Sequence, residues 1–253
     1  MLKLLINGIN GQMGKAMLRT APKWSDAAEI VCGVDADTAP CGCPVYANCE
    51  EIRTDFDVAV DFSVPKATMS ILNYCVKNRK PIVICTTGLN EEQVAAIDTA
   101  SKEIPVFRSG NMSVGINLLR ALARQAKLTL GDGFDVEIVE MHHNRKVDAP
   151  SGTAKMLADS IASASKEEPE YVYGRHDRNR RRAANEIGIH SIRGGTIVGD
   201  HEVLFLGEDE AITLKHQAFS KTVFATGAFQ AALFLAEKTP GKYDMNDLVG
   251  ELL

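Results

Sequence analysis

The 253-residue sequence lacks three features that would each point to a broad class of protein. It has no excess of basic residues, because 28 Lys and Arg stand against 33 Asp and Glu, and the net charge of -5 argues against nucleic acid as the main partner. It has no apolar run near the roughly 20 residues that a membrane span requires. The start, MLKLLINGING, enters an expected strand and turn without a signal-peptide cleavage pattern, which predicts a cytoplasmic protein.

Recognisable metal-binding patterns are also missing. The sequence contains no HExxH segment, and its six cysteines do not form two close pairs. Zinc sites usually separate paired ligands by two or more residues, whereas only one residue separates Cys41 from Cys43. This cluster, with Cys49 nearby, is interpreted as a surface turn without function in preference to a zinc or redox site, and no metal is expected. The remaining cysteines lie in apolar runs and are expected to be buried: Cys32, Cys75 and Cys85.

The first part of the chain alternates strand-like apolar runs with helical segments. Its length and its 45% hydrophobic content suit one large domain or two small ones. Continuous apolar strands separated by helices predict a parallel sheet covered on both faces. The pattern continues to about residue 112, with strands expected at 3–7, 28–35, 57–63, 81–87 and 104–110.

The pattern changes after residue 112, where apolar and polar residues alternate in FDVEIVEMHH as they do in a half-solvated strand. The basic run RHDRNRRRAANE, residues 175–186, is interpreted as a solvated loop in preference to a mobile loop near the substrate. The elements expected in this part are helices at 113–130, 151–165 and 221–238 and strands at 134–143, 186–195, 196–208 and 210–220.

A glycine-rich turn follows the first strand. GINGQMG places Gly8, Gly11 and Gly14 between a strand and a helix, where backbone can approach a pyrophosphate at the positive end of the helix. The spacing is GxxGxxG and not the commoner GxGxxG, but Asp35 ends the second strand 21 residues past Gly14, where a ribose-binding acid is expected. The motif predicts a dinucleotide site; a tight turn that only packs the helix is the alternative.

Asp35 also bears on the choice of cofactor. Its carboxylate can accept hydrogen bonds from ribose hydroxyls and repels a 2′-phosphate, and neither Ala36 nor Asp37 supplies a compensating cation. NADH is therefore favoured, with NADPH possible. Thr86, Thr87 and Gly88 end a later strand, where small hydroxyl residues suit a nicotinamide or ribose, although an ordinary turn would have the same composition.

The densest cluster of polar and titratable groups is HHNRKVDAPSGTA at 142–154. Ser151 can cap the following helix, and the N–H groups of Gly152 and Thr153 then form an anion cradle beside the Lys146 charge. A carboxylate-bearing substrate fits this cradle, and a histidine alongside suits a general acid. A polar loop with an incidental cap is the alternative.

The same stretch carries a resemblance to a known family. EMHHNRKVDAPSGTA, from Glu140 to Ala154, is similar to the signature of the dihydrodipicolinate reductases of bacterial and plant lysine and diaminopimelate synthesis. GINGQMG, DFSVP, NMSVGIN and VGDHEV extend the resemblance over nearly the whole chain. It implies reduction of a small cyclic dicarboxylate, 4-hydroxy-tetrahydrodipicolinate, by NADH or NADPH, with loss of water, to tetrahydrodipicolinate.

The resemblance also implies an α/β fold with two domains. Residues 1–112 and 221–253 would form a Rossmann-like, doubly wound parallel sheet that binds the dinucleotide. An inserted α+β domain at 113–220, with a mixed sheet, would bind the substrate and assemble a homotetramer. No nucleic acid or membrane partner is implied.

Roles follow for individual residues that match the family signature. His142 is implied as the general acid and Lys146 as its partner donor. The substrate carboxylates would be held by His143, Lys146, Ser151, Gly152 and Thr153. The cofactor would be bound by Gly8, Gly11, Gln12, Met13, Gly14, Asp35, Phe62, Thr86, Thr87, Gly88, Asn111 and Met112.

The chain departs from the family pattern at two places. Ser109 and Gly110 stand where many relatives have Ala-Pro or Ser-Pro, and Gln12 stands where some members carry an Arg near the adenosine phosphate. The second departure strengthens the expectation of NADH. Two alternative functions are another dehydrogenase of similar two-domain plan and a non-catalytic NAD-sensing protein, but the latter would be expected to lack a titratable group of the signature, and none is missing.

Overall fold

The computed structural model describes residues 1–176 and 179–252 and divides into two compact units. Met1–Val114 and Lys221–Leu253 form unit 1, and Gly115–Ser220 form unit 2. Unit 1 is therefore built from both ends of the chain. No helix in the described residues is long and apolar enough to cross a membrane.

Unit 1 contains a seven-stranded sheet in which all neighbouring strands run parallel. The strand order is β12-β6-β5-β4-β1-β2-β3. The chain adds β2 and β3 on one side of β1 and then returns to add β4 on its other side, and open α/β sheets bind ligands at this switch between β1 and β4. The strands are β1 (Leu2–Asn7), β2 (Ala28–Val34), β3 (Val45–Tyr46), β4 (Val58–Asp61), β5 (Ile82–Ile84), β6 (Pro105–Arg108) and β12 (Gly241–Tyr243).

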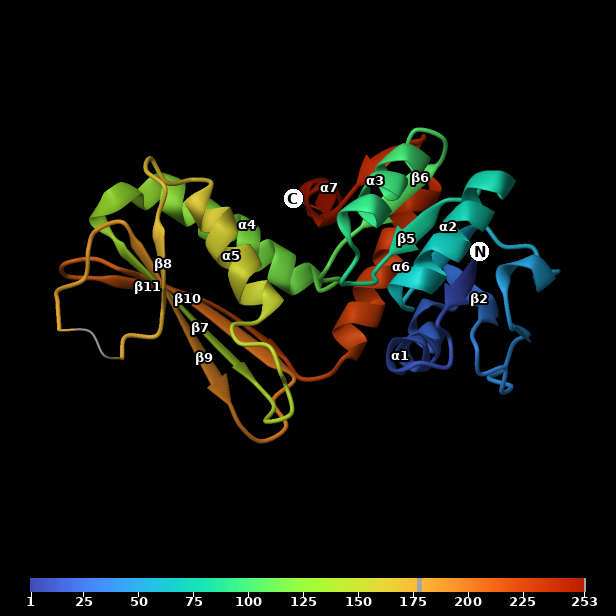
Figure 1. The fold of residues 1–253 in the computed structure, drawn as a ribbon, viewed down its shortest axis with the longest axis horizontal. Helices are drawn as coiled ribbons and strands as arrows, with labels where there is room; N and C mark the ends of the chain where they lie inside the picture. Colours follow the sequence, from blue (N-terminus) through green and yellow to red (C-terminus); the bar gives the residue numbers. More distant parts are fainter. Residues whose placement is uncertain (177–178, 253) are drawn as a thin grey trace. The chain divides into compact units, whose positions relative to one another are not determined.

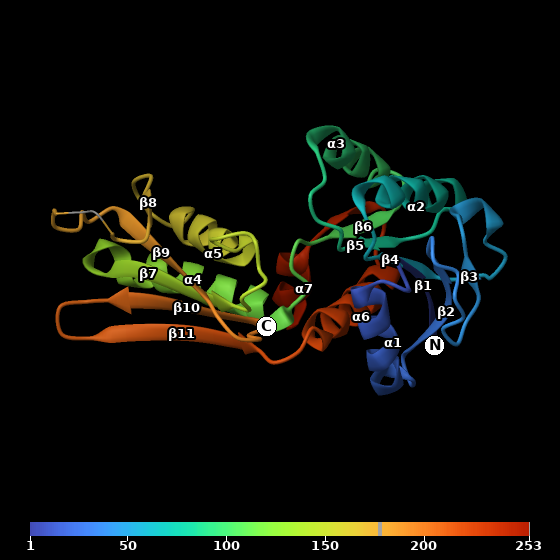
Figure 2. The ribbon, with the colours of Figure 1, turned by 60° about the horizontal axis from the view of Figure 1, so that its bottom comes forward.

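Helices cover both faces of this sheet (Figure 2). Side chains alternate along β1, so that Leu4 and Ile6 join one buried cluster and Leu5 joins the other. The first cluster contains residues of α1 (Gln12–Thr20), α6 (Thr222–Ala236) and α7 (Met245–Leu252). The second contains residues of α2 (Pro65–Asn78) and α3 (Glu91–Ala100). The predicted doubly wound parallel sheet is confirmed.

Unit 2 contains a mixed five-stranded sheet of order β11-β10-β7-β9-β8. Strands β7, β9 and β8 are parallel, whereas β10 runs antiparallel to β7 and β11. The strands are β7 (Asp135–His142), β8 (Glu170–Tyr173), β9 (Glu186–Arg193), β10 (Gly199–Leu206) and β11 (Ala211–Ala218).

Two helices, α4 (Val114–Leu130) and α5 (Gly152–Ala162), lie on one face of this sheet (Figures 1 and 2). Leu119 of α4 and Leu157 of α5 join Ile138 and Phe205 of the sheet in the buried core of the unit. Among the described residues, the short helical turns are η1 (Ala21–Trp24), η2 (Cys49–Glu51) and η3 (Gly131–Gly133).

Most described residues of the basic run after β8 are exposed, as expected for a solvated loop, but its arginines also bind carboxylates of the sheet. Residues 177–178 lie outside the described residues. Arg175 bonds the carboxylates of Glu137 and Glu186, and Arg182 bonds Glu137 and Asp135. These arginines therefore neutralise acidic side chains of β7 and β9, among them the buried Glu186, because a buried carboxylate needs a charged or hydrogen-bonding partner.

The cysteines differ in two respects from the expectation. Cys32 and Cys75 are buried as predicted, but Cys85 is only half-buried. Cys49 is buried, so the cluster is not a surface turn throughout. Cys41 and Cys43 pack against the core with their Sγ atoms 4.0 Å apart. Burial, followed by the neighbouring Cys41, raises the pKa of the Cys43 thiol to about 12, so this thiol stays protonated at neutral pH.

Candidate active site

The register of the unit 2 sheet brings four functional side chains to one face at one end of the strands. Residues two apart on a strand point to the same side, so Glu140 and His142 of β7 share the face covered by helices. On β10, His201 lies opposite Glu140, and on β9, Arg193 lies opposite His142. Of these four residues, only His142 had a role predicted from the sequence.

Glu140 lies at the centre of the cluster and is fully buried. Its Oε1 accepts bonds from Arg193 Nη2 at 2.7 Å and the Ser151 N–H at 3.1 Å. Its Oε2 accepts a bond from Arg193 Nη1 at 2.8 Å and lies 2.5 Å from His142 Nδ1. Burial alone would raise the pKa of Glu140, but these hydrogen bonds hold its pKa far below the usual value, so the side chain is a carboxylate.

The ionisation state of Glu140 determines which nitrogen of the His142 ring donates a hydrogen bond to it. An ionised carboxylate can only accept hydrogen bonds, so Nδ1 of His142 must be the donor in the 2.5 Å contact. The other ring nitrogen, Nε2, lies beside Gly199: a Cβ built on that glycine would be 3.1 Å from it. The side chain is nearly buried, and this nitrogen is the one left for proton transfer.

His201 packs against the ring of His142. The two rings meet edge to face with their centroids 5.2 Å apart. Burial, followed by the proximity of His142, lowers the pKa of His201 to about 3, so His201 is neutral at neutral pH. Its Nε2 lies 3.1 Å from Ser151 Oγ, which already accepts the Ala154 N–H at 3.1 Å and can therefore donate its own hydrogen to His201.

Ser151 caps α5, as the sequence predicted for this position. Its hydroxyl bonds the Ala154 amide, so the first turn of α5 is fixed with its positive dipole end beside the cluster. Gly152 is exposed, and no heavy atom lies within 4 Å of a Cβ built on it. Thr153 is half-buried in the same turn. This arrangement can bind an anion.

The loop between β7 and α5 carries the remaining predicted residues. His143 lies just beyond β7, and its N–H donates to Ile197 O at 2.7 Å. Lys146 Nζ bonds Asp148 Oδ1 at 2.7 Å, and this contact is the first cause that lowers the pKa of Asp148. Arg193 Nη2 donates to Asp148 O at 2.7 Å. The loop with Lys146 is therefore tied to the same arginine that holds Glu140.

The glycine-rich turn of unit 1 requires its glycines. Gly8 has a φ of +83°, and a Cβ there would lie 2.8 Å from Phe62 O. A Cβ on Gly14 would lie 2.2 Å from Ile9 O. Gly11 is the N-cap residue of α1, and Met13 is half-buried in its first turn. The backbone at the start of the helix is thus closely packed and free of side chains at these glycines, which makes it a cradle that suits a pyrophosphate.

Asp35 and Gln12 lie beside this turn with partners that the sequence did not reveal. The Asp35 carboxylate accepts the N–H of Asn10 at 2.9 Å and of Asp37 at 3.0 Å, so it joins the glycine-rich turn to the loop after β2. Lys221 Nζ donates to Gln12 Oε1 at 2.8 Å. A cation from a distant part of the sequence therefore lies at the start of α1.

A second buried carboxylate organises the carboxyl ends of the central strands. Asp61, at the end of β4, is fully buried and accepts bonds from Asn7 at 2.7 Å, Thr68 at 2.6 Å and Thr86 at 2.8 Å, with Ser63 as a further donor. The Thr86 hydroxyl is thereby directed into the scaffold. Asp61 had no role predicted from the sequence, although its place in DFSVP at a strand end was a signal.

The other residues predicted to bind the cofactor lie near these strand ends with different exposures. Phe62 follows β4 and is half-buried, while Thr87 and Gly88 follow β5 and are exposed. Asn111 is half-buried, and its Oδ1 accepts the Ser113 N–H at 2.9 Å. The Met112 side chain belongs to the buried core.

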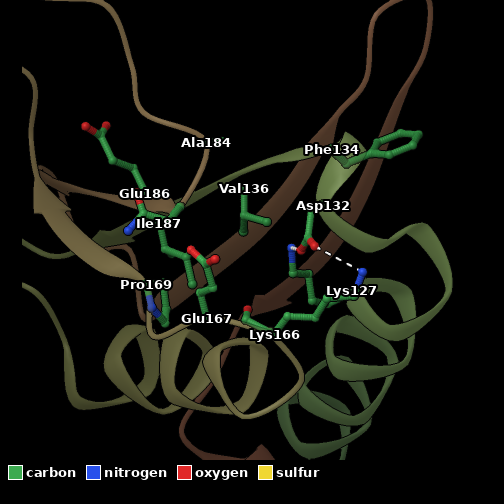
Figure 3. Close-up of a pocket in the computed structure, with 12 residues that line it drawn as sticks. Lys127, Asp132, Phe134, Val136, Lys166, Glu167, Pro169, Ala184, Glu186 and Ile187 are labelled. Atoms are coloured by element: carbon green, nitrogen blue, oxygen red, sulfur yellow. Dashed lines mark hydrogen bonds and ion pairs between the residues drawn. The ribbon is translucent and has the colours of Figure 1, made fainter.

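A separate pocket in unit 2 lies away from this cluster (Figure 3). Lys127 and Asp132 form an ion pair at its wall with 3.0 Å between Nζ and Oδ1. Val136, near the start of β7, lines the pocket, whereas His142 ends that strand. None of the predicted site residues lines it.

Two family models match this chain. The model described as dihydrodipicolinate reductase, N-terminus, matches residues 2–112, and the model described as dihydrodipicolinate reductase, C-terminus, matches residues 115–249. The chain is 50% identical over 249 residues to 4-hydroxy-tetrahydrodipicolinate reductase of Caldanaerobacter subterraneus subsp. tengcongensis, with 98% of each chain covered. It is 45% identical over 251 residues to the enzyme of the same name from Clostridium botulinum, with 99% of each covered.

Solved structures also match the fold of this chain. A dipicolinate-bound dihydrodipicolinate reductase from Paenisporosarcina sp. TG-14 matches with a TM-score of 0.81 at 25% identity, over 97% of this chain and 99% of that chain. A probable dehydrogenase from Thermotoga maritima matches with a TM-score of 0.66 at 13% identity, over 99% and 93% of the two chains. The second likeness is one of fold alone.

Proposed function

This chain belongs to the dihydrodipicolinate reductase family, and we propose that it reduces 4-hydroxy-tetrahydrodipicolinate, with loss of water, to tetrahydrodipicolinate in lysine and diaminopimelate biosynthesis. The structural observation that carries the proposal is the buried Glu140–His142 pair beside the capped start of α5. It combines a proton donor with an anion cradle, the two functions that reduction of a dicarboxylate needs.

The residues of unit 1 fit a nicotinamide dinucleotide. The cradle at Gly8 and Gly14 would be filled by any side chain, and Asp35 ends β2 at the position of a ribose-binding acid. The bound cofactor supplies a hydride to the substrate ring. Gly8, Gly11, Gln12, Met13 and Gly14 would hold its pyrophosphate end, and Phe62, Thr86, Thr87, Gly88, Asn111 and Met112 would form its nicotinamide end.

Hydride addition must be matched by a proton, and His142 donates it from Nε2. Glu140 accepts the Nδ1 hydrogen and so keeps Nε2 directed away from the carboxylate. Lys146, held by its contact with Asp148, supplies a positive charge for a substrate carboxylate. His143, Ser151, Gly152 and Thr153 complete the cradle at the start of α5.

NADH is the favoured cofactor in this proposal. Asp35 is held in place by two backbone amides, and its charge would repel a 2′-phosphate. Lys221 is the opposing feature, because its cation at Gln12 could accept a phosphate. The expected preference is therefore modest.

A homotetramer is proposed through the face of the unit 2 sheet opposite α4 and α5. Val139 and Met141 of β7 point to that face together with Ile192 and Leu204. Ile192 is 47% exposed, and a second copy of the chain would cover this apolar surface. Sedimentation measures the oligomeric state of the unsubstituted protein and of Ile192→Glu. The variant should dissociate, and a monomeric unsubstituted protein would contradict the assembly.

The catalytic proposal is tested in a coupled assay. Pyruvate, aspartate semialdehyde and the synthase that condenses them supply the substrate, and NADH loss is followed by absorbance. His142→Gln should lower turnover by about 10²-fold or more, the usual scale for a general acid. Asn144→Ala, an exposed neighbour in the same loop, should retain activity. NADH loss no faster than without the protein, or full activity of His142→Gln, would contradict the proposal.

A further inference from the structure

We infer that Glu140 and Arg193 form a positioning pair that fixes both the proton-donating histidine and the loop that carries Lys146. This inference rests on the proposed function, because it assigns to the pair a part in proton transfer by His142. Glu140 contacts His142 directly, and Arg193 contacts both Glu140 and Asp148, the residue that bonds Lys146.

The first step is the contact between Glu140 and His142. A carboxylate 2.5 Å from Nδ1 fixes the tautomer and the rotation of the imidazole ring. Nε2 is then held over Gly199, where there is no side chain. A ring without this partner could rotate about its side-chain bonds, and the proton would be presented at different positions. Positioning errors of about 1 Å can cost about 10²-fold in rate.

The second step is the contact between Glu140 and Arg193. A carboxylate that is fully buried is unfavourable unless a cation and hydrogen bonds compensate it. Arg193 bonds both oxygens at 2.7 and 2.8 Å, a bidentate geometry that fixes the plane of the carboxylate. The Ser151 N–H donates a third hydrogen bond to this carboxylate, at 3.1 Å.

The third step links the pair to Lys146. Arg193 Nη2, which bonds Glu140 Oε1, also donates to Asp148 O at 2.7 Å. The Asp148 side chain in turn bonds Lys146 Nζ at 2.7 Å. One guanidinium therefore sets the position of the strand residue that orients the acid and of the loop residue that orients the ammonium.

The alternative role for the pair is a purely structural one, in which the ion pair only joins β7 to β9. The two roles predict different properties for the folded molecules of a variant of the pair. A structural pair changes the folded fraction, whereas a positioning pair changes turnover and the pH dependence of turnover in molecules that are fully folded. Arg193→Lys keeps the cation and removes the bidentate contact, so it separates charge from geometry.

The test compares Glu140→Gln and Arg193→Lys with Glu137→Gln. Glu137 lies on the same strand and also bonds arginines, but it points to the opposite face. For Glu140→Gln we expect a turnover about 10²-fold lower, with KM for the substrate changed less than threefold. For Arg193→Lys we expect an intermediate loss. Glu137→Gln should lower thermal stability and leave kcat within twofold.

The pH profile gives a second readout. The titratable and charged groups around His142 are Glu140 on its own strand, Arg193 on β9, the neutral His201 on β10 and Lys146 in the loop, with His216 of β11 beside His201. Removal of the one negative charge among them disfavours the protonated imidazole. The alkaline limb of the kcat profile should therefore move to lower pH in Glu140→Gln and stay in place in Glu137→Gln.

NMR of protein labelled with 15N-histidine distinguishes this inference from the proposed reaction, because it needs no substrate. A low-field Nδ1–H resonance of His142 is expected in the unsubstituted protein and in Glu137→Gln, and it should be lost in Glu140→Gln. Unchanged turnover and an unchanged profile in a folded Glu140→Gln would overturn the inference. If Glu140→Gln does not fold, unchanged kcat, profile and resonance in Arg193→Lys would overturn it. An inactive unsubstituted protein that shows the resonance would refute the proposed reaction and leave the orientation of His142 supported.

Discussion

Replacement of Gly199 by alanine moves the proposed acid without changing any titratable group. Gly199 is buried at the start of β10, and its missing side chain leaves the space in which His142 Nε2 lies. A Cβ at this position would be 3.1 Å from Nε2 and 3.4 Å from Cδ2 of His142. The substitution therefore pushes on the ring at the atom that is proposed to donate the proton.

The size of the effect follows from the contact distance. Non-bonded heavy atoms prefer separations of about 3.5 Å or more, so the ring must retreat by about 0.4 Å. If 1 Å of misplacement costs about 10²-fold, 0.4 Å costs about sixfold in kcat on the same logarithmic scale. The free energy of unfolding should fall by no more than about 1 kcal/mol, because alanine loses less chain entropy than glycine in a strand and so offsets part of the strain.

The assay is kcat from NADH loss at saturating substrate, with thermal unfolding measured on the same preparations. Gly194→Ala is the matched control, because no heavy atom lies within 4 Å of a Cβ built there. Its N–H donates to His142 O at 3.0 Å, and alanine retains that bond. A Gly199→Ala enzyme with kcat within twofold of the unsubstituted protein would refute the reasoning that the ring position controls proton transfer.

Three further predictions concern ligands and pH. Pyridine-2,6-dicarboxylate should raise the Tm far more than a pyridine monocarboxylate does, and equal shifts would contradict a two-carboxylate site. The enzyme should prefer NADH several-fold in kcat/KM at fixed ionic strength, and Asp35→Ala with Ala36→Arg should shift this ratio towards NADPH; a strong initial preference for NADPH would implicate Lys221. His201 has a folded pKa of about 3 against 6.5 unfolded, so the unfolded chain binds more protons between these values and stability should fall as pH falls from 6.5 to 3. In denaturant titrations His201→Gln should show a shallower fall, and an equal slope would exclude the histidine as its source.

The periodicity of the sequence was sufficient for most of the fold. Continuous apolar runs predicted the parallel strands of unit 1, and the alternation in 134–143 predicted β7. The strands that were not predicted, β3, β8 and β12, span only two to four residues, and their residues are mostly half-buried or exposed. A segment this short has too few positions to display a period, so its pairing is decided by tertiary contacts.

The partners of the proposed site residues were harder to predict from the sequence than the residues themselves. The density of polar groups after β7 singled out His142, Lys146 and Ser151. Arg193 and His201 were missed because they reach His142 through strand register, and register between strands distant in sequence cannot be read from one sequence. Lys221 was missed for the same reason, since only the return of the chain into unit 1 brings it to Gln12.

Glu140 is different, because a local signal for it was present in the sequence. In DVEIVEMH the inward positions of the strand are Val136, Ile138, Glu140 and His142, so the run of apolar side chains is interrupted by a carboxylate and then an imidazole. A charged residue at a position that the alternation assigns to the core must have a compensating partner or a function. The conflict between pattern and residue type could therefore have located the centre of the site from the sequence, whereas the identity of the compensating cation, Arg193, required the structure.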